Sequence, residues 1–87
     1  MIPVISQVEP KPNYRVKLRF DDGQEGEVDI ASLVTFTGVF EPLKDPAYFA
    51  RVMVHQESGT IVWPNGADLD PVILHDLIMK HPQFPSD

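Results

Sequence analysis

The side chains best suited to metal binding or proton transfer in this chain are three histidines. His55 lies in an expected strand, His75 in an expected C-terminal helix, and His81 just after that helix. Two ligands on one helical face are normally four residues apart, and none of the three histidines has this spacing to another. The chain also has no cysteine, which removes thiolate zinc sites. We therefore expect no metal ion and no other cofactor.

Two close carboxylates, Asp68 and Asp70, form a second candidate group, because such pairs bind hard cations or exchange protons. Asp70 precedes Pro71, however, and this dipeptide is typical of a helix start at which the aspartate accepts backbone N–H groups. Asp68 suits the turn that follows Asn65-Gly66. No serine has the glycine-flanked turn of a nucleophile, and no glycine-rich phosphate loop is present. We expect a domain that is not an enzyme and has no catalytic residue.

A strongly patterned hairpin begins the framework that must position these groups. Apolar and basic residues alternate from Tyr14 to Phe20, and acidic residues alternate with apolar ones after Gly23. A two-residue loop would set buried side chains opposite charged ones, whereas a three-residue loop with Gly23 as a left-handed bulge aligns both faces. The predicted register pairs Arg15 with Asp29, Lys17 with Glu27 and Arg19 with Glu25. The basic stripe is thereby neutralised.

The remaining elements complete an α+β fold. We expect an edge strand over residues 3–8, a helical turn over 29–34, a loop over 35–40, and a second hairpin from 52–55 and 60–63. Short helices should follow Asp45-Pro46 and Asp70-Pro71, the last with an apolar stripe of Ile73, Leu74, Leu77 and Ile78. The prediction is one small two-layer domain, residues 1–87, made of antiparallel hairpins with the short middle helix and the C-terminal helix on one face. Prolines predict a frayed tail from about residue 81.

Five residues are candidates for a partner-binding or ligand-binding surface. Two aromatics in the 35–40 loop either fill the core, which is favoured in so small a domain, or form an exposed contact. The turn from residue 63 to 70 is the candidate pocket, although its tryptophan should be largely buried. The candidate surface residues are Phe36, Phe40, Trp63, Asn65 and Asp68.

Composition and charge narrow the classes of partner. The net charge is -6, and the main basic stripe is already paired, so direct binding to nucleic acid is not expected. No segment has the length of a membrane span or the pattern of a signal peptide, which favours a cytoplasmic location without membrane attachment. A chain of 87 residues builds a thin core, which favours association with a partner or with a second copy.

Several short segments form a distinctive succession: Phe20-Asp21-Asp22-Gly23, Val28-Asp29-Ile30, Gly38-Val39-Phe40-Glu41-Pro42-Leu43, Asp45-Pro46 with Phe49, and Trp63-Pro64-Asn65-Gly66-Ala67-Asp68-Leu69-Asp70-Pro71. Together they resemble the bacterial family catalogued as domain of unknown function 2442. The resemblance implies a small α+β domain, often encoded beside domain of unknown function 4160 in an arrangement like that of a toxin and its antitoxin. Some members are fused to a helix-turn-helix; this chain ends at Asp87, so autonomous operator binding is not expected. The resemblance supplies no catalytic residues.

Two functions follow as hypotheses. The first is a protein-interaction module, an antitoxin-like partner of a basic protein encoded next to it, because an acidic surface complements a basic one. The alternative is a small-molecule binder or minor enzyme with its pocket at the turn from Trp63 to Asp70. A deep pocket at that turn would favour the alternative, whereas an exposed apolar patch would favour the interaction module.

Overall fold

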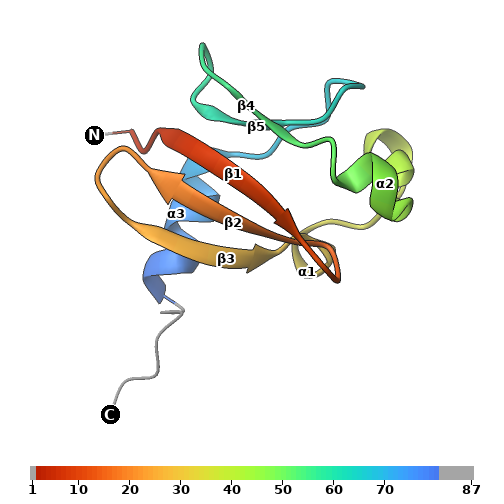
Figure 1. Ribbon diagram of the computed structural model, residues 1–87, viewed down its shortest axis with the longest axis horizontal. Coiled ribbons are helices and arrows are strands. Elements are labelled where there is room, and N and C mark those ends of the chain that lie inside the picture. Colours follow the sequence, from red (N-terminus) through yellow and green to blue (C-terminus); the bar gives the residue numbers. More distant parts are fainter. Residues whose placement is uncertain (1, 81–87) are drawn as a thin grey trace.

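The computed structural model describes residues 2–80, and the predicted frayed tail lies outside them. Antiparallel strands and short helices share one hydrophobic core, and the α+β prediction is confirmed (Figure 1). The three-stranded sheet has the order β1-β2-β3, and β4 and β5 form a separate hairpin. The elements are β1 (Ile5–Lys11), β2 (Arg15–Phe20), β3 (Glu25–Asp29), α1 (Ile30–Leu33), the 3₁₀ helix η1 (Gly38–Lys44), α2 (Pro46–Phe49), β4 (Met53–His55), β5 (Thr60–Val62) and α3 (Pro71–Lys80).

The hairpin of β2 and β3 has the predicted register. Arg15 lies opposite Asp29, Lys17 opposite Glu27 and Arg19 opposite Glu25. Gly23 has a φ of 90°, and its N–H donates to the carbonyl oxygen of Phe20 at 3.0 Å, which closes the three-residue loop. The side chains of Arg19 and Glu25 lie 3.8 Å apart at the surface, a pair worth about 0.2 to 1 kcal/mol. The charges therefore fix the register more than they stabilise the fold.

The turn between β1 and β2 differs from the predicted pattern. Tyr14 was expected to begin the strand, but it and Asn13 have positive φ values of 61° and 65° and lie in the turn. Positive φ is strained for a bulky residue and persists where surrounding contacts determine it. The Tyr14 carbonyl accepts the Ile30 N–H at 2.9 Å, and its hydroxyl donates to the Lys44 carbonyl. Tyr14 is thus a junction between the sheet and the helical segments.

The first strand is longer than predicted and shifted along the chain. We expected residues 3–8, but β1 runs from Ile5 to Lys11 and includes Pro10, which lies opposite Val16. A proline is tolerated there because β1 is the edge of its sheet, where one side of the strand needs no N–H donor. The predicted 35–40 loop is also shorter, since η1 begins at Gly38.

The last helix forms the second layer, behind the three-stranded sheet (Figure 1). Leu74 and Ile78 are buried and Leu77 is half-buried, as the apolar stripe predicts. Ile73 is an exception, because 53% of its surface is exposed. Successive helical residues are separated by about 100°, so a helix that packs Leu74 and Ile78 against the sheet turns Ile73 away. The predicted stripe was therefore too wide.

The second hairpin pairs Met53 with Val62 and His55 with Thr60, a register that the sequence left open. The Ile5 N–H donates to the Gly59 carbonyl at 2.9 Å, which joins this hairpin to the three-stranded sheet.

Replacing Gly23 by alanine should lower the free energy of unfolding by about 1 kcal/mol or more, because its positive φ disfavours a Cβ. No atom lies within 4 Å of the position that the Cβ would occupy, so the expected cost is conformational rather than steric. Gly23→Asn is the matched control and should lose less, since asparagine tolerates positive φ better than alanine. Equal urea midpoints for wild type and Gly23→Ala would contradict the bulge.

Candidate functional site

The turn from Trp63 to Asp70 is held together by its own hydrogen bonds. Trp63 is 1% exposed, as predicted, and its indole N–H donates to the Phe49 carbonyl at 3.0 Å. The Trp63 N–H donates to the Ala67 carbonyl at 2.9 Å, and the Gly66 N–H donates to the Trp63 carbonyl at 2.9 Å. Because the ring is buried, Trp63 offers no contact surface.

The polar residues of the same turn serve structural contacts. The Asn65 side chain donates to the Val39 carbonyl at 2.8 Å and accepts the Ala67 N–H at 3.1 Å. Asp68 is exposed and forms an antiparallel bridge with Val62. The hollows that we describe on the surface lie elsewhere.

The two loop aromatics lie at the margin of the core. Phe36 and Phe40 are half-buried and pack against it, and the Phe36 ring lies 5.0 Å from the Tyr14 ring. This arrangement agrees with the favoured core interpretation. The five candidate residues are thus not brought together on one exposed surface.

The histidines have local partners where the structure describes them. The His55 Nδ1 accepts the Ser58 N–H at 3.2 Å, within the tip of the second hairpin. The His75 Nε2 lies 2.8 Å from an Asp22 carboxylate oxygen, and its ring packs edge-on to Phe20. Within residues 2–80, no three potential ligands cluster as a metal site would require. His81 lies outside the described residues.

Asp70 caps α3, as predicted. Its carboxylate accepts the Val72 N–H at 2.8 Å, and its carbonyl accepts the Leu74 N–H at 3.1 Å. Asp45 caps α2 in the same way, through the Ala47 N–H at 3.0 Å. These carboxylates therefore have structural roles that need no ligand.

A surface that the sequence did not reveal lies at the first two turns of α3. Here a hollow of about 350 Å³ opens between the N-terminal segment, the β2–β3 loop and the helix. Val72 and Ile73 are about half exposed within it, at 49% and 53%. We call it the α3 hollow, and its lining residues are Pro3, Asp22, Val72, Ile73, His75 and Asp76.

The three segments of the α3 hollow are far apart in the sequence but adjacent in space. The Asp21 N–H donates to the Val4 carbonyl at 2.8 Å, which ties the loop to the N-terminal segment (Figure 1). The contact between His75 and Asp22 ties the same loop to α3. One signal in the sequence pointed to this surface: six of the ten α3 residues are apolar, more than one buried stripe needs.

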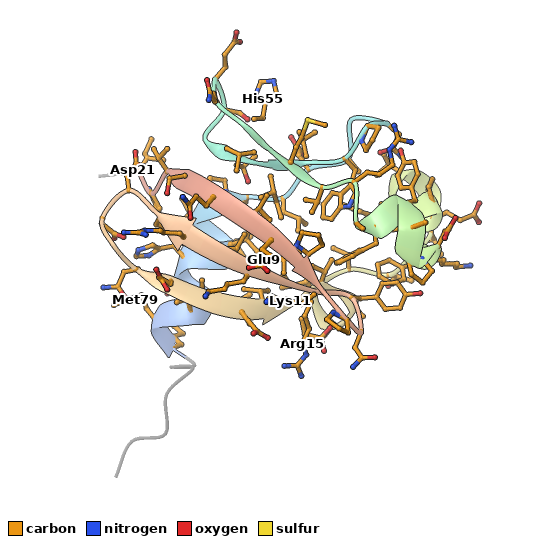
Figure 2. The ribbon with its side chains drawn as sticks, viewed as in Figure 1. Glu9, Lys11, Arg15, Asp21, His55 and Met79 are labelled. Carbon is orange, nitrogen blue, oxygen red and sulfur yellow. The ribbon has the colours of Figure 1, made fainter. Side chains whose placement is uncertain are left out.

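Charge is distributed unevenly between this region and the sheet. The outer face of the sheet, which includes Glu9 and Lys11, lies opposite α3 (Figure 2). Basic and acidic side chains alternate across it, and Glu9 and Lys11 form an ion pair at 3.1 Å. Four of the seven basic residues and four acidic ones lie on this face, which is therefore neutral overall. Its charged residues are Glu9, Lys11, Arg15, Lys17, Arg19, Glu25, Glu27 and Asp29.

The chain belongs to the family described as "Protein of unknown function (DUF2442)", whose model matches residues 5–79. This confirms the resemblance seen in the sequence. Neither the curated proteins nor the solved structures include a significant match. Among the described residues, no helix is both long and apolar enough to cross a bilayer.

Replacing Asp70 by alanine should lower the free energy of unfolding by about 0.5 to 2 kcal/mol, because the Val72 N–H loses its acceptor. Asp70→Asn is the matched control and should retain most of the stability, since asparagine also caps helices well. Thermal unfolding measures both. Tight binding of a divalent cation that Asp70→Ala abolishes would instead identify a metal site.

We expect Asp22 to contribute to the stability of the fold against acid. The Gln24 backbone N–H and then the His75 ring hold the pKa of Asp22 below its ordinary value of 3.8. A lowered pKa contributes stability above the unfolded value that is lost as the pH falls through the folded one. Asp22→Asn should therefore show a smaller fall in melting temperature than wild type between about pH 5 and about pH 2.5. Identical falls in the two proteins would contradict this contribution of Asp22.

Proposed function

We propose that the domain is a non-enzymatic protein-interaction module of the bacterial cytoplasm, the antitoxin-like partner of a basic protein encoded next to it. The observation that carries the proposal is the combination of acidic charge and exposed apolar surface around α3. Val72, Ile73 and Met79 are each about half exposed on one helix. Exposed apolar surface of this kind is typical of a protein-interaction site.

The charge distribution supports a basic partner. The neutral outer face holds most of the cations, so the net charge of -6 comes from the rest of the chain. Exposed acids there include Asp21 and Asp22 in the β2–β3 loop and Asp76 on α3. An acidic surface steers a basic protein toward it and repels the phosphates of nucleic acid. Protein contact is thus a better match to this surface than nucleic-acid binding.

Co-expression with the product of the neighbouring gene should yield a complex that weakens as the salt concentration rises, because salt screens the attraction. The association rate should fall more than the dissociation rate rises, as measured by surface plasmon resonance. Sucrose at equal osmolality is the control and should leave the complex intact. Expression of the neighbouring gene alone should inhibit growth, and co-expression of the domain should relieve this inhibition. A non-toxic neighbour that never co-purifies would contradict the proposal.

A further inference from the structure

The lining of the α3 hollow combines apolar and acidic side chains. Pro3, Val72 and Ile73 supply apolar surface, and Asp22 and Asp76 supply carboxylates. The two apolar side chains on the helix retain about half of their exposure, so their contact area is available to a partner. Filling such a hollow with an aliphatic side chain removes apolar surface from water on both sides.

The carboxylates of Asp22 and Asp76 can both accept further hydrogen bonds. The Asp22 carboxylate accepts the Gln24 N–H at 3.0 Å and contacts the His75 ring, and these contacts lower its pKa. A carboxylate has about four acceptor positions, so these two contacts leave room for a cation. Asp76 pairs with Lys80 at 3.0 Å, but both side chains are more than half exposed. Exposed pairs of this kind are weak, so a cation from a partner can replace Lys80.

We infer that the α3 hollow binds an amphipathic basic segment of a partner protein. An aliphatic side chain of the segment enters between Val72 and Ile73, and flanking lysines or arginines meet Asp22 and Asp76. This inference rests on the proposed function and names the contact site and the chemistry of the partner.

A second copy of the chain matches the hollow less well. Two α3 surfaces brought together would place the Asp22 and Asp76 carboxylates of both copies near each other in a molecule of net charge -6, and like charges oppose such contact. The outer face of the sheet is the other large exposed surface, and a groove of about 660 Å³ lies where it approaches β4. The basic and acidic side chains of the outer face already lie next to one another. This face therefore attracts a basic segment less strongly.

The test uses the full chain and three peptides of about twelve residues, a length that spans three helical turns. One is an amphipathic peptide of lysine and leucine, the second replaces leucine by serine, and the third replaces lysine by glutamate. Fluorescence anisotropy at low salt should show binding of the lysine–leucine peptide alone. NMR shift changes should centre on Asp22, Val72, Ile73 and Asp76. Equal binding of the lysine–serine peptide, or shift changes centred on the outer sheet face, would overturn the inference.

Variants at similarly exposed positions distinguish specific binding at the α3 hollow from non-specific binding elsewhere on the surface. Ile73→Asn should weaken binding at least about tenfold, whereas Met53→Asn, on β4 and equally exposed at 51%, should change it little. Asp76→Asn should weaken it by up to about fivefold at low salt, and Glu57→Gln, which removes one acid elsewhere, by much less. Circular dichroism confirms that each variant is folded. Equal losses within either pair would contradict the assignment.

The same variants distinguish this inference from the proposed function. If the neighbouring product co-purifies and Ile73→Asn does not weaken that complex, the function stands and the α3 hollow is the wrong site. If only the peptide binds, at the hollow, the chemistry of the site stands and the antitoxin-like role fails.

Discussion

The rest of the fold depends on the contacts that the buried Trp63 side chain makes. Its ring lies in the core 5.8 Å from Phe49, and its indole N–H donates to the Phe49 carbonyl, so it joins the second hairpin to α2. The turn that follows is closed by backbone bonds to Ala67, and Asn65 ties it to η1 through Val39. The turn leads to Asp70, the residue that caps the start of α3. One aromatic residue therefore sets where the helical layer starts beneath the sheet.

The thin architecture explains why α3 is left partly uncovered. A sheet of three short strands meets α3 on one side, and within this helix only Leu74 and Ile78 are buried. Small domains bury a limited share of their surface, and an apolar helix then exposes the side that no second layer reaches. In this chain the exposed side lies beside acidic loop residues, whereas four of the seven basic residues lie on the opposite face of the sheet. Layer geometry and charge together define the surface that we propose for binding.

The sequence predicted those features that two independent patterns specified together. The register of β2 and β3 followed because alternation and charge pairing required the same loop length, and Asp70 was recognisable as a cap because Pro71 follows it. Tyr14 was misplaced because its pattern continues the strand, while contacts with distant Ile30 and Lys44 hold it in the turn. Ile73 was misplaced because the orientation of a helix against its sheet is not visible in periodicity. The α3 hollow was missed because its parts lie some seventy residues apart in the chain, and only the fold brings them together.

Hydrogen–deuterium exchange of the domain, alone and bound to the neighbouring gene product, tests the central claim most directly. We predict that the partner slows exchange in α3, over Pro71–Lys80, and in the loop between β2 and β3. Exchange in β4 and β5 should stay unchanged, because these strands contribute nothing to the α3 hollow. Protection confined to the second hairpin or to β1, with α3 unaffected, would contradict the claim that the uncovered helix is the binding surface.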